Sequence, residues 1–293
     1  MSELTRRILF GVVAAPLALV IVFAGGWALA ALLAVGSAIA AWEFFRLARA
    51  TGHAPLNDLG CALAGLLPLA VHARYLGFVE PRMAYLAVVM LVVFTVAIWA
   101  RGVAGKPLGA VATTVVGALY TGGLLSFAYA LRYHNYAAGG IRIGNVTVAA
   151  GGILLGLPVL LTWATDTGAF AVGKTVGGRK LIPSVSPGKT ISGAVGGLIA
   201  SVLVTWLYVR FVLRPGAQLS MTATGMLLFG LVISMAAQVG DVFESLLKRD
   251  AGAKDSSNLL PGHGGVLDRL DSLFFVLPVA HLMIGWLLIP APR

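Results

Sequence analysis

Long apolar segments recur along this chain from one end to the other. Nine of them, separated by short polar stretches, cover residues 8–24, 27–45, 59–73, 83–100, 108–131, 146–172, 191–212, 222–239 and 272–288. About 20 apolar residues are enough for a helix to cross the hydrocarbon core of a bilayer. Charged residues make up 11% of the 293 residues, against about 25% in soluble proteins. The sequence therefore predicts an all-α integral membrane protein, a polytopic bundle of about nine transmembrane helices.

The positive charges indicate how these helices are oriented. With nine spans and the N-terminus inside, 14 of the 21 Lys and Arg residues fall on the inner side and 7 on the outer side. Positive residues are enriched in cytoplasmic loops, so we expect a cytoplasmic N-terminus. The same orientation places two polar segments, 173–190 and 240–271, in the cytoplasm.

The net charge of +10 does not indicate a protein that binds nucleic acid. The basic side chains lie in short loops between apolar segments, and they form no cluster interleaved with aromatic residues. Membrane lipids with anionic headgroups are therefore the expected surface partners, and no nucleic acid is expected. The single cysteine, Cys61, excludes an intrachain disulfide.

Two features of the N-terminal half carry expectations of their own. The third apolar segment is short for a span and contains Pro68 and His72. Glu43 lies at the inner end of the second segment, near Arg46 and Arg49. A long charged side chain in such a place can lie along apolar surface and keep its head in water. We therefore expect an interfacial Glu43 rather than a catalytic one.

A polar segment over residues 166–197 has the composition of a phosphate-binding site. Asp166 lies near the inner end of the sixth apolar segment, and ionisable residues at such depth are usually functional, with ion pairing inside the bundle as the alternative. Glycines that bring backbone N–H groups close to an anion, and lysines that add charge, suit phosphate. The loop offers Ser186, Gly188, Lys189 and Thr190. An ordinary positively charged cytoplasmic loop is the alternative.

A second polar segment, residues 240–272, contains six of the 11 acidic residues of the chain. If the eighth helix continues past Val239, Asp241 and Glu244 share one of its faces, because residues three apart are neighbours on a helix. Asp268 and Asp271 have the same spacing at the start of the ninth helix. Two such carboxylate pairs, with Asp166, would form an all-oxygen site suited to Mg²⁺.

The residues of this second segment resemble the signature of the phosphatidate cytidylyltransferases, also called CDP-diacylglycerol synthases. The resemblance rests on the run Ser245-xx-Lys248-Arg249-xxxx-Lys254-Asp255-xxxxx-Pro261-Gly262-His263-Gly264-Gly265-xx-Asp268-Arg269-x-Asp271, and on Ser186-Pro187-Gly188-Lys189-Thr190 after Asp166. It covers the C-terminal 130 or so residues. We accordingly interpret residues 1–293 as a single domain, with N-terminal helices in 1–145 and a catalytic part in 146–293. The pattern departs at Ile191 and Ser192, where an aromatic and an acidic or amide residue are expected.

The resemblance implies the reaction of CTP with phosphatidate to give CDP-diacylglycerol and pyrophosphate, dependent on Mg²⁺, on the cytoplasmic face of a bacterial-type inner or plasma membrane. It also implies a homodimer as an expected assembly. Asp241 and Asp268 are the first choice as metal ligands, followed by Asp166 and Asp271. The catalytic set consists of these four carboxylates with Lys248 and Arg249. The expected substrate-binding residues are Ser186, Lys189, Thr190, Lys254, Asp255, His263, Gly264, Gly265 and Arg269.

Three other functions stay open at this point. A CTP-dependent lipid kinase would use similar residues but release CDP, and a CDP-ether-lipid synthase would differ only in its lipid. An ion-coupled transporter could also carry intramembrane carboxylates. Transporters tend to have broken helices at corresponding positions of two repeats, whereas the charges here gather at one end of the chain. A cytidylyltransferase is therefore the favoured interpretation.

Overall fold

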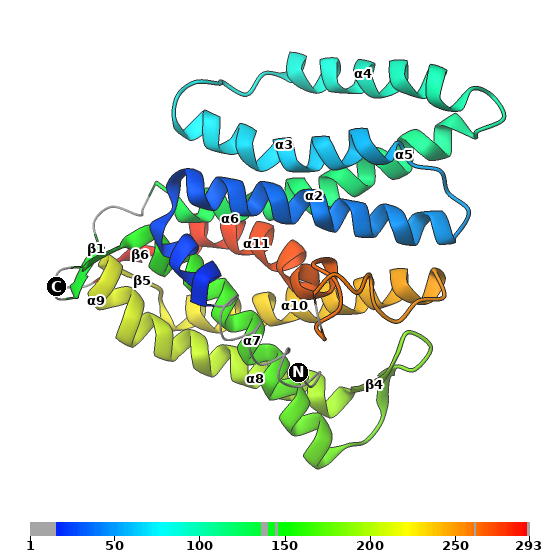
Figure 1. Cartoon of the computed structure of the whole chain (residues 1–293). Helices are drawn as coiled ribbons and strands as arrows, with labels where there is room; N and C mark the ends of the chain where they lie inside the picture. The colour runs from blue at the N-terminus through cyan, green and yellow to red at the C-terminus, as the bar shows by residue number, and fades with distance from the viewer. Residues whose placement is uncertain (1–15, 136–139, 144–145, 261, 292–293) are drawn as a thin grey trace, which may run out of the picture. The chain divides into compact units, whose positions relative to one another are not determined.

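The computed structural model describes residues 16–135, 140–143, 146–260 and 262–291. The chain is mostly helical (Figure 1). After a helical stretch over residues 16–24, the helices are α2 (Gly26–Ala50), α3 (Asn57–Tyr75), α4 (Met83–Arg101), α5 (Pro107–Ala118), η1 (Leu119–Gly123), α6 (Phe127–Arg132), α7 (Ala150–Val176), α8 (Ile191–Tyr208), η2 (Val209–Leu213), α9 (Arg214–Ala217), α10 (Ala223–Asp250) and α11 (Leu267–Leu287).

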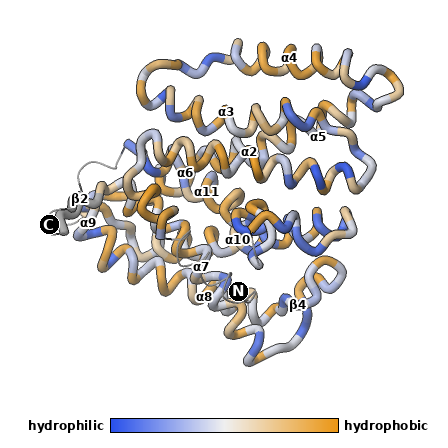
Figure 2. Tube along the Cα trace, viewed as in Figure 1, coloured by the Kyte–Doolittle hydropathy of each residue, from blue (hydrophilic) through white to orange (hydrophobic). Residues whose placement is uncertain are grey.

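Within the described parts of the chain, seven helices are long and apolar enough to cross a membrane, and Figure 2 shows hydrophobic residues along most of their turns. They correspond to seven of the nine predicted segments, so the prediction of an α-helical integral membrane protein is confirmed. Of the first predicted segment, residues 8–15 lie outside the described residues. The third segment is helical, as α3, but is not among the seven, because Asp58, His72 and Arg74 lower its mean hydropathy.

In the described ranges, three pairs of short antiparallel strands accompany the helices, and the sequence did not predict them. They are β1 (Gly140–Ile143) with β2 (Val146–Ala149), β3 (Lys180–Ile182) with β4 (Ser186–Thr190), and β5 (Leu219–Ser220) with β6 (Ile289–Pro290). Val146 therefore lies in a strand, and α7 begins only at Ala150. The expected start of the sixth span at Val146 was wrong by four residues, since the apolar sequence continues through both elements.

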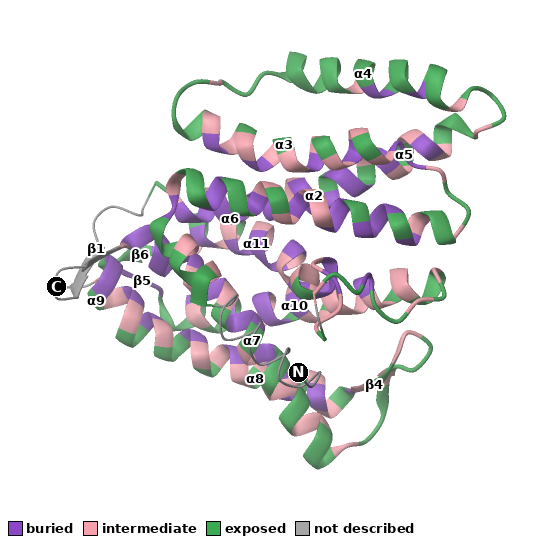
Figure 3. Cartoon of the chain, in the orientation of Figure 1, coloured by how far each residue is buried: buried purple, intermediate pink, exposed green. Residues whose placement is uncertain are grey.

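The chain divides into two compact units, and the first comprises Met1–Ala18, Gly26–Tyr129 and Leu247–Leu270. Within it, Phe45 of α2 is fully buried. A Cβ atom at Gly60 would come within 2.4 Å of the Phe45 ring, and one at Gly117 within 2.3 Å. Small residues let helices approach closely in a membrane, so these two glycines are required where they stand. On α4, by contrast, only Val93 and Ala97 are buried (Figure 3).

The second unit comprises Leu19–Gly25, Ala130–Leu246 and Asp271–Arg293. Its helices α7 and α8 pack through small residues: a Cβ at Gly168 would lie 2.5 Å from that of Ala200, and one at Gly196 would lie 2.5 Å from that of Val172. This close packing fixes the position of the β3–β4 hairpin, because β4 leads directly into α8. The predicted division near residue 145 remains a prediction.

Helices α10 and α11 carry most of the acidic residues of the second polar segment. Helix α10 continues past Val239 to Asp250, so Asp241 and Glu244 do lie one turn apart on the same helix. Helix α11 begins at Leu267, which places Asp268 and Asp271 in its first two turns. The expected spacing of both carboxylate pairs is therefore confirmed.

Candidate active site

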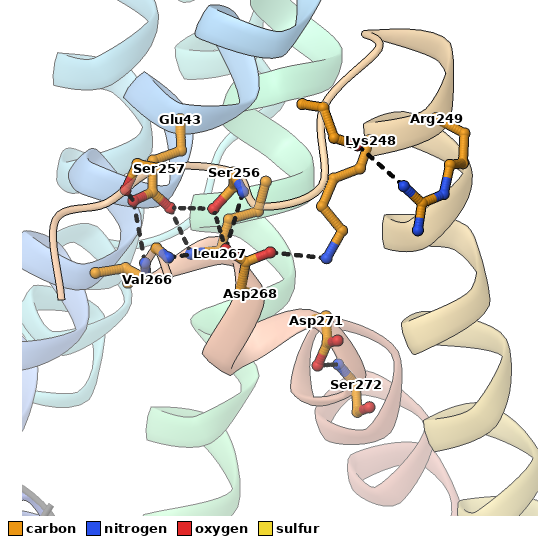
Figure 4. Close-up of polar contacts among 12 residues, drawn as sticks. Glu43, Lys248, Arg249, Ser256, Ser257, Val266, Leu267, Asp268, Asp271 and Ser272 are labelled. Carbon is orange, nitrogen blue, oxygen red and sulfur yellow. Dashed lines mark hydrogen bonds and ion pairs between the residues drawn. The ribbon is translucent and has the colours of Figure 1, made fainter. Parts of the chain in front are cut away.

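In the first unit, the carboxylate of Asp268 organises the loop that joins α10 to α11 (Figure 4). Its Oδ2 atom accepts hydrogen bonds from the backbone N–H of Ser256 at 2.9 Å, from the hydroxyl of Ser256 at 2.9 Å and from the N–H of Gly265 at 2.8 Å. These donors come from the two ends of the loop. Because one oxygen atom binds both ends, Asp268 holds them together.

The other oxygen atom of Asp268 forms an ion pair with Lys248 of α10. The ammonium Nζ lies 2.7 Å from Oδ1, and the two side chains are 13% and 4% exposed. A charge-assisted hydrogen bond between largely buried groups is stronger than a pair on the surface. The ion pair thus holds Lys248 in a site that is mostly shielded from solvent.

Glu43 of α2 binds the same loop, although the sequence indicated an interfacial side chain in water. That expectation was wrong: Glu43 is fully buried. Its carboxylate accepts from the backbone N–H of Val266 at 3.1 Å and of Leu267 at 2.6 Å. It also accepts from the hydroxyl of Ser256 at 3.1 Å and from that of Ser257. These four donors compensate the carboxylate for the water it loses on burial.

A tight turn closes the tip of this loop. The N–H of Leu260 donates to the carbonyl of Gly264 at 2.9 Å, and the N–H of His263 donates back to the carbonyl of Leu260 at 2.9 Å. Gly262 and Gly264 have φ angles of +72° and +78°, which residues with a side chain rarely adopt. Gly264, a predicted substrate-binding residue, is therefore also required by the turn, as is Gly262.

A polar cavity of about 510 Å³ lies beside the turn. Its lining residues are Lys254, Asp255, Asn258, Leu260, Gly262, His263, Gly264 and Arg269. Five of them are predicted substrate-binding residues, and the cavity brings these together. Gly265 does not line the cavity, and its N–H donates to Oδ2 of Asp268. Arg249 is exposed, and its guanidinium donates to the carbonyl of Ala253 at 3.4 Å.

The second unit contains a separate cluster around Lys189 of β4. Its ammonium lies 2.7 Å from Oδ2 of Asp241 on α10, with the side chains 28% and 33% exposed. Both residues line a cavity of about 440 Å³, which is more apolar than the first. Asp166, Lys174, Thr190 and Gln238 line it as well. The structure thus brings the predicted residues Asp166, Lys189, Thr190 and Asp241 together.

Thr190 has a structural role beyond lining this cavity. It is the N-cap of α8, and its hydroxyl accepts from the N–H of Gly193 at 3.1 Å. Ser192, one of the two residues that depart from the family pattern, lies 3.1 Å from that hydroxyl and donates to the carbonyl of Gly177. Ser186 pairs with Ile182 in the hairpin and does not line the cavity.

The remaining predicted metal ligand, Asp271, accepts a hydrogen bond from the N–H of Ser272 at 2.6 Å. Among the residues that the structure describes, no three His, Cys, Asp or Glu side chains form a ready-made metal site. The carboxylate oxygens of Asp241 and Asp268 are nevertheless the hard ligands that Mg²⁺ prefers. Each carboxylate has a lysine as its counter-charge.

Sequence reasoning missed Glu43 and the two serines that bind it, Ser256 and Ser257. Glu43 met the criterion that drew attention to Asp166, since both are acids in apolar segments. The nearby Arg46 and Arg49 suggested a surface position instead. The serines carry no such signal, because a hydroxyl in a polar loop is ordinary.

Comparison with known proteins gives consistent matches. A model of the cytidylyltransferase family matches residues 5–287. A phosphatidate cytidylyltransferase of Bacillus subtilis (strain 168) is 30% identical over 288 residues, which cover 97% of this chain and 99% of that protein. One from Staphylococcus epidermidis is 46% identical over 125 residues, 43% of this chain and 46% of that protein. One from Staphylococcus aureus (strain COL) is 45% identical over a match of the same length.

Proposed function

Because the chain belongs to the cytidylyltransferase family, we infer that it is a membrane nucleotidyltransferase that makes CDP-diacylglycerol for phospholipid synthesis from CTP and phosphatidate. The observation that carries this inference is the pairing in both polar clusters. In each, a lysine suited to phosphate is held 2.7 Å from a carboxylate suited to a metal, Lys189 on Asp241 and Lys248 on Asp268. Such pairs keep cations oriented for an incoming polyphosphate.

The reaction needs positioning and charge neutralisation more than acid–base catalysis. An oxygen of the phosphatidate phosphate attacks the α-phosphorus of CTP, the bond from that phosphorus to the β-phosphate oxygen breaks, and pyrophosphate leaves with the bonding electrons. A phosphate monoester is already ionised near neutral pH, so no strong base is required. Lys189, Lys248 and the cations of the polar cavity would bind the phosphate oxygens.

We propose Mg²⁺ as the cofactor. Asp268 is the first candidate ligand in the first unit, and Asp241 is the first in the second unit, followed there by Asp166 and Asp271. The bound ion supplies positive charge that offsets the charge of the triphosphate. When no metal ion is bound, the lysine paired with each carboxylate provides the counter-charge. Such a counter-charge is needed because unpaired carboxylates in a poorly solvated place repel one another and take up protons. As phosphate arrives, Lys189 and Lys248 can move from carboxylate to phosphate oxygens.

We propose a cytoplasmic active site in a bundle of about nine spans with a cytoplasmic N-terminus, supported by the asymmetry of Lys and Arg. Single cysteines at the exposed positions Ser184 and Asn258, in a Cys61→Ala background, test this orientation. Both are expected to react with an impermeant thiol reagent only after the cells are opened. Labelling in intact cells would contradict it. A homodimer also remains a proposal, which cross-linking in membranes can test.

The function is tested with the purified protein in detergent, phosphatidate, Mg²⁺ and each of the four common nucleoside triphosphates in turn. We expect pyrophosphate and a nucleotide-bearing lipid with CTP, and little product with the others. Asp241→Asn, which keeps the shape of the side chain and removes its charge, serves as the inactive control. A phosphorylated lipid with CDP would indicate a lipid kinase, and no turnover with CTP would contradict the assignment.

A further inference from the structure

Glu43 is fully buried. Among the described acidic residues of the N-terminal half, it accepts the most hydrogen bonds. Four donors converge on it from the loop between α10 and α11, two hydroxyls and two backbone N–H groups (Figure 4). An apolar residue at this position would leave these buried donors without acceptors, which costs more free energy than the hydrogen bonds contribute. Its partners therefore require a carboxylate or a close equivalent.

The four donors come from the two ends of the loop. Ser256 and Ser257 follow shortly after α10, whereas Val266 directly precedes α11 and Leu267 is its first residue. A carboxylate at a helix N-terminus is favourable, because the first N–H groups of a helix have no partner within it. Glu43 therefore caps α11 from another helix and at the same time fixes the other end of the loop.

Asp268 binds the same two ends, through Ser256 and Gly265. A Cβ atom at Gly265 would come within 2.4 Å of Oε1 of Glu43 and 2.1 Å of Oγ of Ser256. No side chain fits at Gly265 while both groups stay in place. The two carboxylates and this glycine thus form one packed clamp at the base of the loop.

The segment that the clamp holds carries the polar cavity. Asn258, His263 and Gly264 lie between the clamped ends, and Lys254 and Arg269 lie just outside them. A loop closed by one base has few ways to move while that base is intact, so His263 on the loop and the cations Lys254 and Arg269 beside its ends keep fixed positions. Displacement of a reacting group by about 1 Å can lower the rate by roughly 100-fold.

We propose that Glu43 is a positioning residue for cytidylyl transfer: it holds the α10–α11 loop so that the cations of the polar cavity face the substrate phosphates. This inference rests on the proposed function. Glu43 itself is fully buried and acts through the loop, without touching substrate.

The test uses the full-length enzyme in detergent and the substitution Glu43→Gln, which keeps the size of the side chain but removes one acceptor and the charge. Glu80→Gln is the matched control, because Glu80 is an acid with a side chain that is 84% exposed. Turnover is measured per folded molecule with CTP and phosphatidate. Loop motion is measured with a spin label on Asn258→Cys in a Cys61→Ala background.

We expect Glu43→Gln to lower kcat by roughly 10- to 100-fold, with a smaller change in KM, and to increase the mobility of the label. Glu80→Gln is expected to match the wild type in both. If Glu43→Gln does not accumulate as folded protein, Ser257→Ala removes a single donor of the clamp and is expected to shift both measurements in the same direction by less.

Wild-type kcat and label mobility in these variants would overturn the proposal. A loss of activity that follows only the loss of folded protein would overturn it too, since it would mean a purely structural role. An inactive wild type would contradict the proposed function instead. In that case the change in label mobility would still report whether Glu43 holds the loop.

Discussion

Replacement of Asp268 by Asn separates the two tasks of this carboxylate. Three donors meet at Oδ2, and Lys248 meets Oδ1. The amide of Asn has one acceptor oxygen, which can take the place of Oδ2 and keep the loop closed. Its N–H₂ group then faces the ammonium of Lys248, so that two donors meet and a positive charge loses its partner.

The magnitude follows from the burial of the pair. Removal of one partner from a buried ion pair costs about 3–5 kcal/mol, mostly because the other charge stays behind. Lys248 is 13% exposed, so we expect the lower end, about 3 kcal/mol, or roughly 100-fold in the unfolding equilibrium. The double variant Asp268→Asn/Lys248→Met removes the stranded charge and is expected to regain about 2 kcal/mol.

Denaturant unfolding of the detergent-solubilised variants measures these free energies. Asp255→Asn is the control, because Asp255 is exposed in the same loop and its replacement is expected to change stability by less than about 0.5 kcal/mol. CDP-lipid formation is expected to fall by orders of magnitude in Asp268→Asn and not to recover in the double variant. If the two single substitutions add without coupling, the reasoning from the ion pair is refuted.

Three further predictions concern other contacts. Lys189→Ala is expected to lower kcat/KM by roughly 10- to 100-fold, through the loss of a charge-assisted contact of about 1.5–3 kcal/mol. It is expected to change the free energy of unfolding by less than about 1 kcal/mol, because its ion pair with Asp241 is partly exposed. An unchanged kcat/KM would remove Lys189 from the site. Thr190→Ala is expected to cost about 1 kcal/mol of stability through loss of the N-cap of α8, whereas Thr190→Ser keeps the hydroxyl. Equal stability of the two variants in unfolding experiments would argue against the cap. Gly265→Ala is expected to destabilise the fold by about 1–3 kcal/mol, since a Cβ atom has no room beside Ser256, and a wild-type unfolding midpoint would show that the clamp is looser than described.

The helices could be predicted because a bilayer demands long apolar segments. In the part of the chain that the structure describes, seven of the nine predicted segments recur as helices able to span it. Their ends could not be, since the hydropathy signal stops where a helix leaves the membrane. Helix α10 continues 11 residues beyond Val239 to Asp250, and five of those residues are charged. Strand β2 was missed for the opposite reason: Val146 to Ala149 is as apolar as the helix that follows.

Much of the candidate site could be predicted from residue types alone. Lysines and glycines suited to phosphate, and acids suited to a metal, marked Lys189, Asp241 and Asp268 correctly as members of polar clusters. Spacing along the chain could not reveal Glu43, because its partners Val266 and Leu267 are more than 220 residues away and contribute only backbone N–H groups. Any residue type can supply those groups, so the sequence carries no trace of the contact.

The fate of the phosphorus atoms of CTP tests the assigned reaction. CTP is prepared with ³³P at the α-position and ³²P at the γ-position and incubated with the purified enzyme, phosphatidate and Mg²⁺. Attack of the lipid phosphate on the α-phosphorus predicts a lipid product that contains ³³P and no ³²P, with all ³²P in pyrophosphate. A lipid product that contains ³²P, accompanied by CDP that contains ³³P, would show transfer of the γ-phosphoryl group and contradict the assignment.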